Sequence, residues 1–144
     1  MTICPKFLYS GPDVPWMNPQ CLGINTLPPR SNLYTYPSEK EALKAEPLDS
    51  PWHLLLDGKW NFKLYKKPAD LDQGIIEPHW KESGWGRIKV PGNWMMQGHD
   101  YPHYTNVQMP FSHQPPKVPE ENPTGVYRTN FTLPKAWKER RTVI

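Results

Sequence analysis

The sequence has little cysteine and no long apolar run. Cys4 and Cys21 are the only two thiols, too few for a disulfide framework or a cysteine-based metal cluster, so we expect ordinary reduced cysteines. No stretch approaches the roughly 18 apolar residues needed to cross a bilayer. The first residues lack a basic start followed by an apolar core, the pattern of a secretory signal. We therefore expect a cytoplasmic protein with no membrane partner.

A surplus of charge of one sign is also missing. The 17 basic and 14 acidic residues give a net charge of +3, and the two signs are interleaved over most of the length. A nucleic-acid binder would instead carry a broad basic stripe beside exposed aromatic residues. The sequence contains neither a glycine-rich phosphate loop nor an internal repeat. We expect no nucleic-acid partner and no nucleotide chemistry.

Catalytic machinery is absent as well. There is no Gly-x-Ser-x-Gly elbow, and neither cysteine lies in a motif that lowers a thiol pKa. Glu120 and Glu121 are adjacent carboxylates, but cleavage of a glycosidic bond needs two carboxyl groups about 5–9.5 Å apart across that bond. Neighbours on an extended chain point in opposite directions, so we expect solvated turn residues. We assign no catalytic residue to this chain.

Proline and aromatic residues are abundant. The chain has 19 prolines, seven tryptophans and seven tyrosines in 144 residues. Proline fixes φ and removes an amide donor, which disfavours long helices. The aromatic content argues against disorder, and the length suits one domain with a core of its own.

The first 50 residues predict an extended arm with one short helix. Residues 1–37 show no sustained period, and their apolar side chains gain free energy by burial against another surface. Ser38 and Glu41 fit a capping box, and Pro47 ends the helix, which we place near residues 38–46.

Residues 51–144 predict short strands. After the Asp57-Gly58 turn, Trp60, Phe62 and Leu64 alternate with polar residues and Tyr65, the pattern of a half-buried strand. We expect further strands over residues 87–90, 127–133 and 142–144. A strand that begins in the last three residues has no return partner, so we expect the sequence to be truncated within a domain.

The run from residue 90 to 111 concentrates histidine, amide and aromatic side chains. His99, Asp100 and His103 include metal-ligand types, but Pro102 interrupts any helix that would gather them, and we expect no metal site. A carbohydrate surface is the stronger hypothesis, since flat aromatic faces stack on sugars and amides bind hydroxyls. The alternative, which stays open, is that the aromatics are core and the amides fix turns. The residues concerned are Asn93, Trp94, Gln97, Asp100, Tyr101, Tyr104 and Asn106.

Several motifs occur together in one order: Trp-Met-Asn-Pro from residue 16, Leu-Pro-Pro-Arg from 27, Leu-Asp-Gly-Lys-Trp-Asn-Phe from 56, Val-Pro-Gly-Asn-Trp from 90, Tyr-Thr-Asn-Val from 104, and residues 119–128. In this order they resemble the amino-terminal sugar-binding domain of β-galactosidases (lactase type) of glycoside hydrolase family 2. The resemblance implies an all-β fold, a jelly-roll β-sandwich of the galactose-binding type, incomplete at its C-terminus. In a complete enzyme it lies beside a (β/α)8 barrel.

The resemblance also implies site residues. Asn106 is expected to bind galactosyl hydroxyls, and Val107 to line the same pocket. Trp94, His103 and Tyr104 are further candidates for substrate contact. A second family contact, an aspartate, lies past the end of this sequence.

Catalysis and metals are implied to lie outside this chain. The catalytic glutamates and the Mg²⁺ and Na⁺ ligands of such enzymes belong mostly to the barrel. Some relatives carry an acidic metal ligand immediately before the arm's tryptophan, where this chain has Pro15 before Trp16. We expect no cofactor to be bound by the chain itself.

The function implied is the amino-terminal part of a cytoplasmic β-galactosidase. Such an enzyme hydrolyses terminal β-D-galactose residues, for example in lactose, with retention, and its arm contributes to a homo-oligomer. The isolated chain is expected to be inactive without the barrel. The alternatives are a stand-alone carbohydrate-binding module and a structural or assembly domain whose aromatics are all core.

Overall fold

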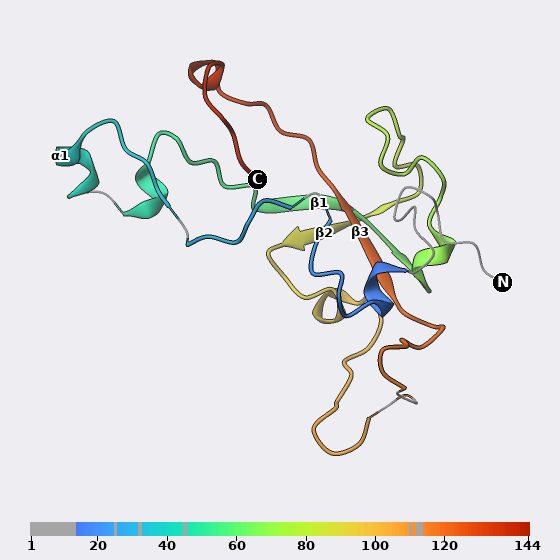
Figure 1. Cartoon of the computed structure of the whole chain (residues 1–144). Coiled ribbons are helices and arrows are strands. Elements are labelled where there is room, and N and C mark those ends of the chain that lie inside the picture. Colours follow the sequence, from blue (N-terminus) through green and yellow to red (C-terminus); the bar gives the residue numbers. More distant parts are fainter. Residues whose placement is uncertain (1–13, 25, 32, 45, 110, 112–113) are drawn as a thin grey trace.

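The regular structure of the chain is a small antiparallel sheet with short helical turns (Figure 1). The computed structural model describes residues 14–24, 26–31, 33–44, 46–109, 111 and 114–144. Cys4 and the start of the arm lie outside the described residues. The strands are β1 (Gly58–Tyr65), β2 (Gly86–Val90) and β3 (Thr124–Arg128), and the helix is α1 (Glu39–Ala42). The 3₁₀ turns are η1 (Pro15–Met17), η2 (Pro47–Asp49), η3 (Pro68–Asp70), η4 (Met95–Gln97) and η5 (Lys135–Trp137).

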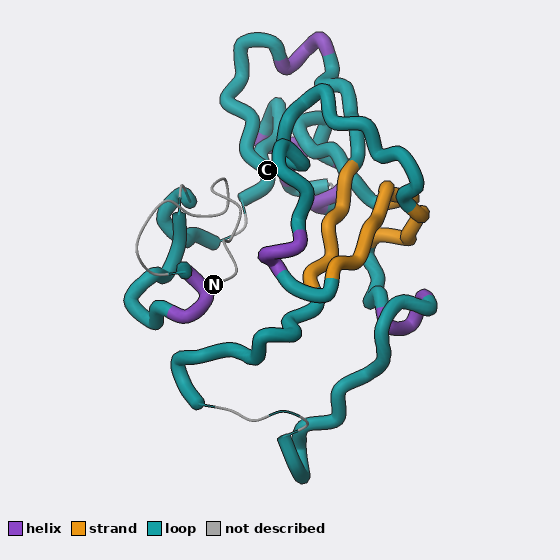
Figure 2. The backbone as a smooth tube through the Cα atoms, turned by 90° about the vertical axis from the view of Figure 1, so that its right-hand side faces the viewer, coloured by secondary structure: helices purple, strands orange, loops and turns teal. Residues whose placement is uncertain are grey.

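The sheet has β1 at its centre, with the order β2-β1-β3 and both pairings antiparallel. Trp60 lies opposite Ile88 on β2, and Phe62 lies opposite Tyr127 on β3. Figure 2 shows the three strands side by side, with loops making up most of the rest of the chain. The expected all-β class is confirmed, and the open sheet forms one layer, as an incomplete sandwich requires.

Strand β1 is covered on both faces. Phe62, 1% exposed, packs with Tyr127 on one face, while Tyr65, 8% exposed, packs with Leu71 and Ile75 on the other. The alternating pattern predicted the strand correctly and placed Tyr65 on the same face as Lys63, as the structure has it, but it did not predict that this second face is covered. The loop between β1 and β2 folds over that second face and buries the ring, a contact that alternation along one strand does not encode.

The later strands differ from expectation. Strand β3 occupies residues 124–128 rather than 127–133, and residues 142–144 form no strand. After Arg128 the chain leaves the sheet, and Phe131 and Leu133 line a groove instead. A residue pattern gives a segment's tendency to form a strand, whereas the strand itself forms only where another strand is in reach.

The short helix is confirmed, although it is shorter than expected. Ser38 is its N-cap, and the Ser38 hydroxyl accepts a hydrogen bond from the amide of Glu41 at 3.3 Å. The described part of the arm is largely exposed, and Leu22 is 96% accessible. Leu22 is not covered within this chain, so burial of the arm's apolar side chains against another surface stays a prediction. The arm is held further along, where the Ser50 hydroxyl donates to the carbonyl of Thr35.

Candidate functional site

The segment after β2 folds back along the outer edge of that strand. The Gln97 side chain accepts a hydrogen bond from the Lys89 amide at 2.8 Å and donates one to the Lys89 carbonyl at 3.0 Å. A Cβ atom on Gly92 would lie 2.7 Å from Gln97 Nε2 and 2.9 Å from the Lys89 carbonyl oxygen, so this approach requires glycine. Gln97 thus pairs with the strand edge rather than pointing free toward a ligand.

Trp94 and His99 pack on the sheet. The Trp94 ring lies 6.1 Å from the Phe62 ring, and the His99 ring lies 4.7 Å from it, between centroids. Trp94 also lies directly over Gly125 of β3. Its indole N–H is buried and makes no hydrogen bond to any described residue. The structure therefore shows Trp94 as a packing residue at the base of the site.

Asp100 begins the outward loop. Its φ of 61° lies in the left-handed region, where Asp and Asn are the most frequent residues after glycine. Its side chain is 10% exposed, and Oδ2 lies 3.9 Å from His103 Nε2. The Tyr101 ring stacks on the His103 ring, with centroids 4.7 Å apart and planes 24° apart. These three residues form the root of the loop.

The loop beyond this root is exposed. Tyr104 is 72% and Val107 84% accessible, and Asn106 is also exposed. In Figure 1 this segment, yellow to orange by the sequence bar, extends away from the sheet. The structure therefore brings His103, Tyr104, Asn106 and Val107 together on one protruding loop and leaves Trp94 at its base. Their contact with substrate stays a prediction.

One of the two adjacent glutamates has a charged partner. Glu120 forms an ion pair with Lys67, with Nζ and Oε1 2.8 Å apart, while its side chain stays 82% exposed. This hydrogen bond holds the pKa of Glu120 below its usual value and raises the pKa of Lys67. A carboxylate held ionised is a poor proton donor, so Glu120 is unsuited to act as a general acid.

The candidate metal ligands are directed apart. His99 faces Phe62, whereas Asp100 and His103 face each other at the loop root. Among the residues that the structure describes, no three His, Cys, Asp or Glu side chains gather closely enough to hold a metal ion.

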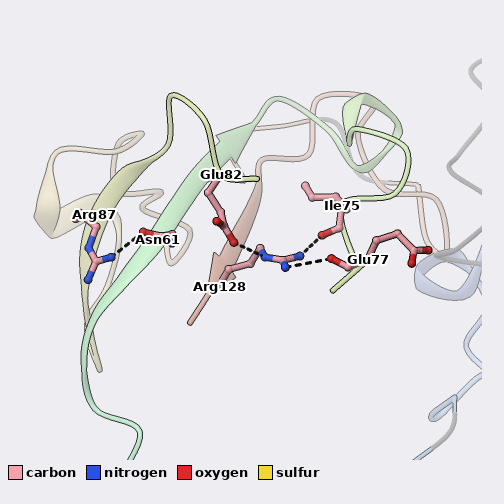
Figure 3. A network of polar contacts seen from close by, with 6 residues as sticks. All are labelled: Asn61, Ile75, Glu77, Glu82, Arg87 and Arg128. Carbon is pink, nitrogen blue, oxygen red and sulfur yellow. Dashed lines mark hydrogen bonds and ion pairs between the residues drawn. The ribbon is translucent and has the colours of Figure 1, made fainter. Parts of the chain in front are cut away.

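Arg128 ties the loop between β1 and β2 to the sheet, as Figure 3 shows. Its Nε donates to Glu82 at 2.7 Å, and its two terminal nitrogens donate to the carbonyls of Ile75 and Glu77. Arg128 and Glu82 are only 20% and 22% exposed. The sequence did not reveal this role, because two of the three partners of Arg128 are backbone carbonyls and all three lie 46 to 53 residues away along the chain.

A second polar cluster lies on the same side of β1. Asp72 Oδ2 accepts from the Tyr65 hydroxyl at 2.7 Å and from Lys63 Nζ at 3.0 Å. The hydrogen bond from Tyr65, and after it the one from Lys63, lowers the pKa of Asp72. The hydrogen bonds that Lys63 makes with Tyr65 and Asp72 raise the pKa of Lys63. Burial raises the pKa of Tyr65. The cluster fastens the covering loop and carries no geometry for catalysis.

A groove of about 1140 Å³ lies away from the loop of residues 101–109. It is lined by residues 27–31 and 33–35 of the arm, by several residues between 52 and 56, and by several residues between Phe131 and Ile144. Trp137 closes one side, because its indole donates to the Pro51 carbonyl at 3.1 Å. None of the predicted substrate residues lines this groove.

No helix in the described part of the chain is both long and apolar enough to span a membrane. Cys21 is partly buried.

Comparison with known proteins identifies relatives over most of the chain. It is 42% identical over 129 residues to a protein of Psychromonas ingrahamii named beta-galactosidase, covering 90% of this chain and 12% of that protein. It is 43% identical over 121 residues to one of that name from Vibrio cholerae, covering 83% and 11%. A third, from Photobacterium profundum, is 40% identical over 124 residues, covering 84% and 12%.

The chain thus spans about an eighth or less of the length of the curated relatives it matches. Residues 54–144, well over half of the chain, match the family described as "Glycosyl hydrolases family 2, sugar binding domain". On that match, the chain belongs to the sugar-binding domain family of the family 2 glycosyl hydrolases.

Proposed function

We propose that this chain supplies part of the galactoside-binding site of a β-galactosidase that hydrolyses terminal β-D-galactose residues, such as that of lactose, with retention. The family match and the names of the relatives support this proposal. The observation that carries the site assignment is the exposed loop on which Tyr104, Asn106 and Val107 follow one another closely.

The loop offers the chemistry that a sugar requires. The Asn106 amide has two donors and an acceptor for galactosyl hydroxyls. Val107 provides an apolar wall, and the Tyr104 ring, 72% accessible, has a face free to stack on the pyranose. His103 borders the same surface. Trp94 lies at the base of the loop, where its ring packs near Phe62 and over Gly125.

The chemical step is proposed to occur on other parts of the enzyme. The described residues offer no activated nucleophile, and Glu120 is ion-paired. Mg²⁺ prefers oxygen ligands, and Pro15, beside Trp16, offers no side-chain ligand at that position. Mg²⁺ and Na⁺ would belong to the complete enzyme. The isolated chain is therefore proposed to be inactive.

The organisation proposed is an arm over residues 1–50 and the first part of a sugar-binding sandwich over residues 51–144. The arm is proposed to contribute to contacts within a homo-oligomer in the cytoplasm. The Ser50 hydroxyl bonded to Thr35 and the edge-on contact between Tyr34 and His53, 5.6 Å between centroids, support a defined path for this segment.

The site assignment is tested in the intact galactosidase by Asn106→Ala. Loss of hydrogen bonds to a substrate hydroxyl should lower kcat/KM by about tenfold or more. Gln108→Ala, two residues along the same exposed loop, is the matched control and should leave turnover within about twofold. Unchanged galactoside turnover in Asn106→Ala would remove Asn106 from the site.

The alternative of a stand-alone carbohydrate-binding module is favoured by one observation, the exposure of Tyr101 and Tyr104 on a loop. Calorimetric titration of the isolated chain with galactose separates the two. Measurable binding supports the module, whereas its absence, with activity restored on mixing with a polypeptide that carries the barrel, supports the shared site.

A further inference from the structure

The root of the exposed loop holds a carboxylate in an unusual setting. Asp100 has a side chain nine-tenths buried, and its Oδ2 atom makes no hydrogen bond to any described residue. An ionised carboxylate buried without a partner is unfavourable unless a positive charge compensates it. The position therefore calls for a cation close to Oδ2.

His103 is the group placed to provide that charge. Its Nε2 lies 3.9 Å from Asp100 Oδ2, beyond the roughly 2.7–3.2 Å of a formed N–H···O hydrogen bond but close enough for a small movement to make one. Imidazole changes its charge near neutral pH. The Tyr101 ring stacks on the His103 ring, with the planes 24° apart.

Few other ionisable groups compete for His103. Asp100 and Tyr101, both of its own loop, are the titratable residues with a recorded contact to His103 in the described part of the chain. His99 precedes Asp100 but faces Phe62 on β1. A protonated His103 would therefore direct its charge to Asp100.

The loop depends on this contact. Among the described residues, those from 101 to 109 make no hydrogen bond to the rest of the chain, and Tyr104 and Val107 are largely exposed. The Asp100–His103 pair thus links the loop to its base, while the stack of Tyr101 on His103 lies within the loop. Asn106 follows His103 by three residues on the same exposed loop.

We propose that Asp100 and His103 act as positioning residues, a latch that closes when His103 is protonated and then holds the loop bearing Asn106 in one position. That closure affects galactoside binding is a consequence that rests on the proposed function. The latch itself concerns only the loop and can be tested without sugar.

The test measures the order of the loop by {¹H}-¹⁵N heteronuclear NOE on the amides of residues 104–107 in the full 144-residue chain, at about pH 5.5 and about pH 7.5. We expect higher values at the lower pH, where the pair is complete. Asp100→Asn should remove this difference while keeping the left-handed backbone, which Asn also tolerates. His103→Gln should remove it as well.

The matched control is His79→Gln, which replaces an exposed histidine of another loop and should keep the pH difference. Equal NOE values at both pH values in the unmodified chain would overturn the latch, as would a difference that persists in Asp100→Asn. Spectra of the β1 and β3 amides show whether each variant keeps the sheet.

The link to substrate is tested in the intact galactosidase. Asp100→Asn should flatten the pH dependence of KM for a galactoside between about pH 5.5 and 7.5, with kcat changed by less than about twofold, because a positioning residue acts on binding. If the loop NOE values depend on pH as expected but Asn106→Ala leaves turnover unchanged, the latch stands and the proposed substrate site fails. If the NOE values do not depend on pH, the latch fails whatever the sugar data show.

Discussion

Trp94 lies on Gly125 so closely that no other residue fits beneath it. A Cβ atom at position 125 would be 2.5 Å from Trp94 Cζ3 and 2.9 Å from Phe62 Cε2. The Val-Pro-Gly-Asn-Trp motif and the Gly-Val-Tyr-Arg segment of β3 are thereby joined across the sheet. The base of the candidate site is set by this contact, because the loop that follows Trp94 starts from it.

Gly125→Ala should destabilise the fold by about 1–3 kcal/mol, since the added methyl group forces Trp94 or Phe62 out of place. The free energy of unfolding from urea titration measures this effect. Gly86→Ala on β2 is the control, because its Cβ would meet nothing nearer than the Phe62 carbonyl at 3.8 Å. Equal losses in the two variants would contradict the contact described here.

Arg128→Lys should cost about 1–3 kcal/mol of stability, because lysine cannot replace three donors aimed at Glu82 and two carbonyls. The loop between β1 and β2 should then become sensitive to limited proteolysis. Arg87→Lys on the exposed edge of the sheet, where Arg87 bonds Asn61 at 2.7 Å, is the comparison and should change stability by less than about 0.5–1 kcal/mol. A loop that resists proteolysis in Arg128→Lys would argue against this anchoring role.

Asp72→Asn should alter how stability depends on pH. The pKa of Asp72 is lowered from 3.8 by its hydrogen bonds, so its contribution is present above that value and is lost as the pH falls through the lower, folded-state value. The difference in unfolding free energy between the unmodified chain and Asp72→Asn should therefore be largest near neutral pH and shrink below about pH 4. Asp72 is 42% exposed, so solvent screening keeps the effect small.

Trp94→Ala and Asn106→Ala should separate packing from recognition. Trp94→Ala should cost about 3 kcal/mol of stability, as expected for a tryptophan that fills a packed site. Asn106→Ala, on an exposed loop, should change it by less than about 0.5 kcal/mol. Thermal unfolding followed by tryptophan fluorescence measures both. A large loss in Asn106→Ala would favour the structural-domain alternative over a binding loop.

Part of the fold follows from local pattern. The alternation at Trp60, Phe62 and Leu64 predicts β1, and the Ser38 cap predicts the start of α1, because each depends on residues adjacent in sequence. The ordered motifs predict the family, which the comparison confirms. No hydrophobic period in the sequence predicts that Asn106 and Val107 are exposed on a loop, and only the structure shows it.

The sequence by itself determined the all-β class, the central strand and the family. Only the tertiary structure decided that Tyr65 is buried, that β3 ends at Arg128, that Trp94 rests on Gly125 and that Asp100 meets His103 at the loop root. The physical reason is that strand alternation and helix caps are set by neighbours along one regular segment. The Trp94–Gly125 contact instead joins segments far apart in the sequence, and the other features depend on how a loop folds back or on a backbone turn such as that at Asp100.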